Sequence, residues 1–213
     1  MPENTISSFR KAIALGADGI ELDVHLCKSS EPVVIHDDTV ERTTDGKGKV
    51  SDFTLAELRE LHIARGEHIP TLKEVLEALG DDIYCFVEVK TVDAALPTAE
   101  LISSYVKKGW QGEKLYLVSF KLTALQAAIK EFPQLRIGAS FEEQFEHDDI
   151  IKAKKLGAHT ILPDHCLLTP QHVETAHELG MKVFTWTVNE PSNIRRASAM
   201  QVDGIITDYL DRL

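Results

Sequence analysis

Three carboxylates at the ends of two apolar strands are the residues of this sequence best suited to chemistry. Glu21 and Asp23 stand two positions apart in the stretch GIELDV, so on a strand their side chains share one face. Glu88 stands in IYCFVEVK, among mostly apolar residues, where a carboxylate is rarely buried without a partner. Oxygen ligands of this kind suit a hard cation, with water and a phosphate oxygen completing its coordination. The pattern therefore predicts a site for one divalent cation, Mg²⁺ or Ca²⁺.

Each carboxylate also has a purely structural interpretation. Lys90 follows Glu88 by two positions on the same strand face, and these two side chains could form a buried ion pair. Glu21 or Asp23 could equally pair with a Lys or Arg of a neighbouring element, which would offset their repulsion and desolvation. The sequence alone leaves these alternatives open.

His36 follows the strand-like stretch PVVI and is the histidine best placed for acid–base chemistry. The two strands predicted over 18–24 and 31–37 are too close for a parallel crossover, so we expect an antiparallel hairpin. A two-residue turn at 29–30 would place Asp23 opposite His36, on the same face of the sheet. There His36 would act as a general acid or base; the alternative is a hydrogen-bonded core histidine.

Other side chains carry weaker signals. Trp186 lies near the end of a further strand, where it could stack on an apolar part of a substrate or simply pack in the core. Lys90 could bind a phosphate as a point charge, and His165 could reach the mouth of the site. The chain has no Walker motif, no GxGxxG and no G-x-S-x-G elbow, and no Cys/His cluster suggests zinc.

These residues must be positioned by alternating strands and helices, a pattern that predicts parallel strands joined by helical crossovers. Helices are expected over 5–16, 71–79, about 97–108, 122–131, about 148–156, from Thr169 to Gly180 and about 191–200. Seven parallel strands are expected, ending at Asp23, Lys90, Phe120, Ser140, Pro163, Val188 and Asp208. A (β/α)8 barrel needs about eight strands and carries its functional face at their C-terminal ends. The missing strand would precede the first helix.

The chain, residues 1–213, is predicted to be a single barrel domain. Only the segment 37–70 breaks the alternation, since it contains DGKGK and a short helix capped at Thr54. We expect this segment to be a small inserted subdomain or a lid over the site.

The composition is that of an ordinary globular protein, with 43% hydrophobic and 27% charged residues. The net charge of −11 argues against nucleic-acid binding but allows an anionic small substrate if a metal is present. There is no apolar run of about 18 residues, so no stable membrane insertion is expected, and no signal peptide is visible. Cys27, Cys85 and Cys166 show no CxxC spacing and indicate reduced thiols, hence a cytoplasmic location.

Together these motifs resemble the bacterial glycerophosphodiester phosphodiesterases. PENT, GIELDVHL, PVVIHDDTVERTTDGKGKVSD, VEVK, VSF, FTWTVN and DGIITDY follow that family's order and spacing from residue 2 to residue 210. The resemblance implies a (β/α)8 barrel with an inserted subdomain after the IHD strand. It also implies metal-dependent hydrolysis of small glycerophosphodiesters to glycerol 3-phosphate and an alcohol.

The resemblance implies a role for each candidate residue. The metal ligands of the family correspond to Glu21, Asp23 and Glu88 in this sequence. His36 corresponds to one of two catalytic histidines, and Lys90 corresponds to a phosphate contact.

The resemblance also implies that Trp186 forms a wall of the substrate pocket.

This sequence departs from the family in one respect. The family's second histidine belongs to a His-Arg-Gly strand end upstream of PENT, and this sequence contains no His-Arg-Gly. We therefore expect the chain to lack the first strand, one acid–base group and a phosphate-binding arginine. Hydrolysis by this chain would then be impaired.

Other functions and assembly states stay open at this point. A non-catalytic barrel that binds phosphodiesters or metal without turnover is the main alternative. A phospholipase D-like enzyme acting on whole lipids is a weaker one, because no apolar surface helix or disulfide pattern is present. An open barrel would leave strand edges unpaired at Ile20 and Ile205, which predicts a destabilised, homo-oligomeric or aggregation-prone chain.

Overall fold

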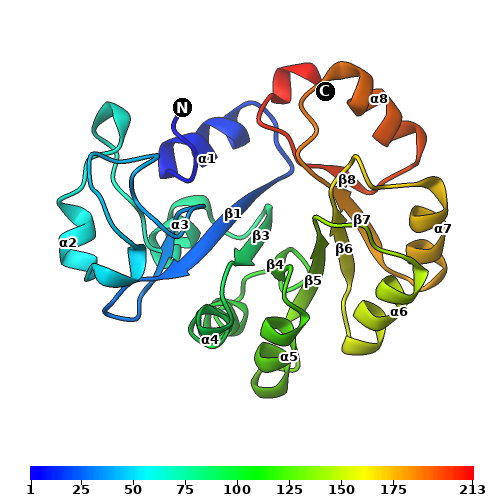
Figure 1. Cartoon of the computed structure of the whole chain (residues 1–213), viewed down its shortest axis with the longest axis horizontal. Coiled ribbons are helices and arrows are strands. Elements are labelled where there is room, and N and C mark those ends of the chain that lie inside the picture. The colour runs from blue at the N-terminus through cyan, green and yellow to red at the C-terminus, as the bar shows by residue number, and fades with distance from the viewer.

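The computed structural model describes all 213 residues and contains one curled sheet with helices on its outer side (Figure 1). The strands are β1 Gly19–Leu26, β2 Pro32–Val34, β3 Tyr84–Val89, β4 Leu115–Ser119, β5 Arg136–Phe141, β6 Thr160–Pro163, β7 Lys182–Thr185 and β8 Gly204–Ile205. The helices are α1 Ile6–Ala14, α2 Leu55–Arg59, α3 Leu72–Leu79, α4 Val92–Lys107, α5 Leu122–Glu131, α6 His147–Leu156, α7 Pro170–Glu178 and α8 Pro191–Ala199. Short 3-10 turns are η1 Val50–Asp52, η2 Ala64–Gly66 and η3 Leu210–Arg212.

The sheet has eight strands in the order β2-β1-β3-β4-β5-β6-β7-β8. Strands β1 and β3 to β8 run parallel to their neighbours, as predicted, while β2 pairs antiparallel with β1. No pairing joins β8 back to β1, so the curled sheet stays open between them (Figure 1). The arrangement is a barrel-like α/β fold in which the carboxyl ends of the parallel strands share one rim.

The hairpin forms, but the predicted register is wrong by one residue. The Ile35 amide donates to the Asp23 carbonyl at 3.0 Å, so Ile35, rather than His36, lies opposite Asp23. The loop contains three residues, 28–30, instead of two, and Ser30 adopts a left-handed φ of 66°. A left-handed residue closing a three-residue loop is a common hairpin geometry. Since a one-residue slip moves each side chain to the other face, His36 does not lie beside Asp23 in the way predicted.

Helix α4 begins at Val92, earlier than the predicted start near residue 97. A proline inside a helix removes one backbone hydrogen bond and usually destabilises the helix. In the structure Pro97 lies inside the helix, while Ala94 and Ala95 before it are fully buried. Burial of these residues in the main core stabilises the extra turn despite the proline.

The hydrophobic core has three parts. The largest, with 34 buried residues, lies between the sheet and its helices. A smaller one lines the inner face of the curled sheet and consists of Phe86, Tyr116, Val118 and Leu162, with Trp186 packed against it. A separate cluster, which includes Val40, Val50 and Leu58, lies beneath the segment 37–70.

The segment 37–70 carries α2, η1 and η2 and projects from the β1 side of the molecule (Figure 1). The Thr54 side chain caps α2 and forms a reciprocal capping box with Glu57. The segment thus has regular structure, and it shares a small core with the β1–β2 hairpin, which contributes Cys27, Val33 and Ile35. Its designation as an inserted subdomain or lid stays a prediction.

Candidate active site

The parallel pairing of β1 and β3 brings the three predicted carboxylates together. Asp23 is the register partner of Glu88, and Glu21 lies two residues earlier on the same face of β1. Ligand oxygens of all three residues lie within 4.8 Å of one another. Asp23 and Glu88 are buried, although both lie near the carboxyl ends of their strands. We call Glu21, Asp23 and Glu88 the carboxylate cluster.

Lys90 contacts the carboxylate cluster directly. Its Nζ lies 2.7 Å from Asp23 Oδ1 and 2.5 Å from Glu88 Oε1. Burial opposes the charge of the ammonium, but the two carboxylates outweigh burial and raise the pKa of Lys90. The predicted Glu88–Lys90 ion pair therefore exists, and it includes Asp23 as well.

One ammonium does not balance the carboxylate cluster. Burial, followed by repulsion from Asp23 and Glu88, raises the pKa of Glu21 well above its usual value. Burial also raises the pKa of Glu88, despite the attraction of Lys90. Lys90 is the charged partner of Glu88 Oε1, which is otherwise buried without a further partner. A set of hard oxygen donors whose negative charge exceeds that of the one neighbouring ammonium fits a divalent cation.

Asn4, in the PENT motif, orients one member of the cluster. Its Nδ2 donates to Asp23 Oδ2 at 2.9 Å, and its Oδ1 accepts the Asp23 backbone amide at 3.3 Å. Asn4 adopts a left-handed φ of 52°, a conformation that asparagine tolerates better than most residues. This contact could not be predicted from the sequence, because the two residues are distant along the chain.

His36 lies at the rim of the carboxylate cluster, with its side chain 54% exposed. Its Nδ1 is 2.7 Å from Asp37 Oδ1, and its carbonyl oxygen is 3.1 Å from Nε2 of the buried His25. A charged His36 side chain lies near enough to oppose, weakly, the rise in the pKa of Glu88 that burial causes. The shifted hairpin register thus moves His36 away from Asp23 but leaves it within electrostatic range of the cluster.

Trp186 follows β7 and faces the inner core of the curled sheet. Its Nε1 donates to the Leu162 carbonyl at 2.7 Å, and its ring meets Phe120 edge-on with centroids 5.6 Å apart. The side chain is half-buried. Core packing therefore accounts for part of its surface and leaves part available to a ligand.

A second group of ligand-type side chains, Asp164, His165 and Cys166, follows β6. No Cys/His cluster suggesting zinc was expected from the sequence, yet ligand atoms of these residues lie within 4.8 Å of one another. The Arg196 guanidinium donates to the His165 carbonyl and lies 3.2 Å from His165 Nδ1. The Arg196 guanidinium, a cation of the protein itself, therefore binds His165 of this group.

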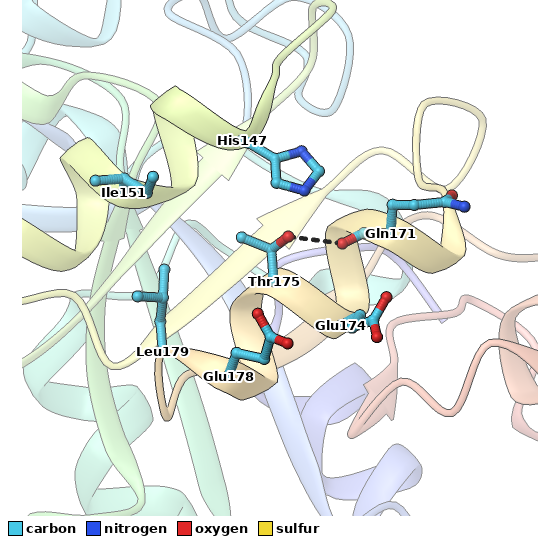
Figure 2. A pocket seen from close by; sticks show the side chains of 7 residues that line it. All are labelled: His147, Ile151, Gln171, Glu174, Thr175, Glu178 and Leu179. Carbon is cyan, nitrogen blue, oxygen red and sulfur yellow. Dashed lines mark hydrogen bonds between the residues drawn. The ribbon is translucent and has the colours of Figure 1, made fainter.

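A surface groove of about 390 Å³ lies between α6 and α7, away from the predicted residues (Figure 2). Figure 2 shows His147 and Ile151 on α6 and the other lining residues on or just after α7, namely Gln171, Glu174, Thr175, Glu178 and Leu179. None of the candidate site residues lines this groove.

The open α/β barrel and the acidic cluster at its rim define a class of protein, the barrel enzymes whose active site lies at the carboxyl ends of the strands. The model of the glycerophosphoryl diester phosphodiesterase family matches residues 1–212. The chain belongs to this family and is a hydrolase of the phosphodiesterase class.

Individual relatives agree with the family match. A glycerophosphodiester phosphodiesterase from Caldanaerobacter subterraneus subsp. tengcongensis is 39% identical, over 98% of this chain and 89% of its own. A solved glycerophosphodiester phosphodiesterase from Thermotoga maritima is 31% identical, with a TM-score of 0.82 over 99% of this chain and 90% of its own. An Oleispira antarctica phosphodiesterase, solved with the product sn-glycerol-3-phosphate, is 27% identical, with a TM-score of 0.89 over 99% and 89%. No helix of this chain is both long and apolar enough to cross a membrane.

Proposed function

We propose that this protein hydrolyses glycerophosphodiesters to glycerol 3-phosphate and an alcohol, with one divalent cation, Mg²⁺ or Ca²⁺, bound to Glu21, Asp23 and Glu88. The observation that carries the proposal is the convergence of three carboxylates on one rim, with only Lys90 to balance them. The product bound by the Oleispira antarctica relative supports the same substrate class.

The candidate residues divide the chemistry among them. A cation bound at the cluster would polarise the phosphodiester. Lys90 adds positive charge beside the cluster and contacts the phosphate as a point charge. His36 exchanges a proton with the nucleophile or the leaving group. Trp186 forms one wall of the substrate site.

We further propose that the 213-residue chain turns over slowly. The family's second histidine and its arginine belong to a His-Arg-Gly motif that this sequence lacks. Loss of one general acid or base costs about 10²–10⁴-fold in rate. A chain extended upstream by a strand ending in His-Arg-Gly should therefore be faster by that order.

The proposal also covers the segment 37–70, the cellular location and the self-association of the chain. The segment 37–70 acts as an inserted subdomain beside the site. A cytoplasmic location suits the three free cysteines, since reduced thiols persist in a reducing compartment. The chain self-associates through its open sheet edges, a point developed below.

The test is release of glycerol 3-phosphate from glycerophosphocholine, with Mg²⁺, with Ca²⁺ and with a chelator. We expect cation-dependent release from the chain, faster release from the extended chain, and a loss of at least about 10²-fold in Glu88→Gln. Glu142→Gln, at an exposed position outside the cluster, is the matched control and should leave the rate unchanged. The absence of release from both the chain and its extended form would refute the proposal.

A further inference from the structure

Arg42 lies between two carboxylates that come from separate parts of the chain. Its Nε and Nη2 donate to Asp37 at 2.6 and 2.9 Å, and its Nη1 and Nη2 donate to Glu3 at 2.8 and 2.6 Å. The planar guanidinium thus forms a two-bond fork with each partner. Isolated surface ion pairs contribute little, but paired forks in a network fix geometry.

Asp37 extends this network to His36. Hydrogen bonds from Arg42, and a weaker one from His36, hold the pKa of Asp37 far below its usual value. Asp37 is therefore a carboxylate at neutral pH, and a carboxylate can only accept hydrogen bonds. Its 2.7 Å contact then requires that Nδ1 of His36 carry the proton. When the imidazole is neutral, Nε2 is left with the free lone pair.

The backbone of His36 is held independently. The buried His25 side chain contacts the His36 carbonyl through Nε2 at 3.1 Å. Both the main chain and the imidazole of an otherwise exposed histidine are thus anchored. Such anchoring is unnecessary for a solvated surface residue but is needed by a group that must meet a substrate in one orientation.

We propose that Glu3, Arg42 and Asp37 form a positioning chain that fixes the tautomer and orientation of His36, so that Nε2 is the atom that exchanges the proton. None of the three touches the reacting atoms, and each acts through its neighbour. Asp37 and Arg42 belong to the segment 37–70, so this segment supports the site through two side chains. The inference rests on the proposed catalytic role of His36.

The direct test is ¹⁵N NMR of the imidazole nitrogens in this chain, at a pH where His36 is neutral. We expect the proton on Nδ1 in the wild type and a mixture of both tautomers in Asp37→Ala. Arg42→Lys keeps the charge but loses the fork, and should give a partial mixture. The matched control is Arg65→Lys in the same segment, because the Arg65 side chain hydrogen-bonds only to the sulfur of Met1 and forms no ion pair.

Turnover supplies the second readout. Arg42→Lys should lower kcat by up to about 10²-fold with little change in KM, and should cause no further loss when combined with His36→Gln. An Nε2-protonated His36 in the wild type, or an unchanged tautomer in Asp37→Ala, would overturn the inference. A fixed Nδ1 tautomer, with no turnover by either this chain or its extended form, would support the positioning chain and refute the proposed function. The failure of one proposal can therefore be told from the failure of the other.

Discussion

At the scale of single residues, the carboxylate cluster has features of both a buried ion pair and a cation-binding site. Lys90 pairs with Asp23 and Glu88, which is the structural interpretation that the sequence left open. Yet Glu21 has no ion-pair partner, and the pKa of its carboxyl is raised by burial and by its acidic neighbours. The cluster is therefore under-neutralised in the metal-free protein. A buried pair needs no third carboxylate, whereas a cation site does.

Glu21→Gln should have opposite effects on the stability of the metal-free protein and on cation binding. Because the folded-state pKa of Glu21 is raised, its ionisation costs folding free energy, and this cost grows as the pH rises through that pKa. We expect the metal-free variant to melt higher than the wild type at pH 8, by about 2–4 °C for each kcal/mol relieved. The increase in melting temperature that Mg²⁺ or Ca²⁺ gives the wild type should disappear.

Thermal melts with and without cation check this prediction, with Glu142→Gln as the exposed control. A Glu21→Gln variant that keeps the full cation-induced increase would exclude Glu21 as a ligand. A variant that melts lower without metal would show that Glu21 has a stabilising partner.

At the scale of elements, the hairpin of β1 and β2 decides where His36 lies. The three-residue loop requires a left-handed conformation at Ser30, which a serine adopts at a cost that glycine avoids. The preceding Ser29 has a different role, since its hydroxyl accepts the Leu55 amide at 3.0 Å and so ties the loop to α2. Two adjacent serines thus contribute with opposite sign to the stability of one loop.

Ser30→Gly should therefore stabilise the protein, by up to about 1 kcal/mol, because the left-handed strain is relieved. Ser29→Gly is the matched variant and should destabilise by about 1 kcal/mol, because the Leu55 amide loses its acceptor. Urea unfolding of both variants measures the difference. Equal destabilisation by the two substitutions would contradict the observed loop geometry.

At the scale of the whole molecule, the open sheet and the large net charge have opposite effects on self-association. The outer edge of β8 has no strand partner, and neither has the edge of the N-terminal half of β1 that faces away from β3. Such unpaired edges favour association between copies. The charge of −11 repels copies from one another at neutral pH and low salt. Which of the two dominates depends on the solution conditions.

Self-association should therefore increase as the pH falls toward the pI of about 5.3 and as salt screens the charge. Sedimentation velocity across pH 8 to 5.5, at low and at high salt, measures this. The extended chain of the turnover assay is the control, since a further strand would cover one of the edges. An apparent mass that is the same under all these conditions would refute association through the open edges.

The sequence by itself determined the alternation of strands and helices, the parallel sheet and the shared face of Glu21 and Asp23. These features depend on local periodicity, which the backbone imposes regardless of what surrounds it. The family could be predicted from motifs that occur in its order along the chain, and the match over residues 1–212 confirms the prediction. The early start of α4 was missed, because the extra turn is stabilised by burial of Ala94 and Ala95 in the main core, which only tertiary packing decides.

Only the tertiary structure decided the hairpin register, the position of Lys90 between two carboxylates and the chain from Glu3 through Arg42 to His36. Each of these depends on contacts between segments that are distant in sequence. A one-residue shift at a loop costs little locally but moves a side chain to the opposite face of a sheet. Residue types and periodicity therefore predict which groups carry the chemistry, while the packing of distant segments decides which of them meet.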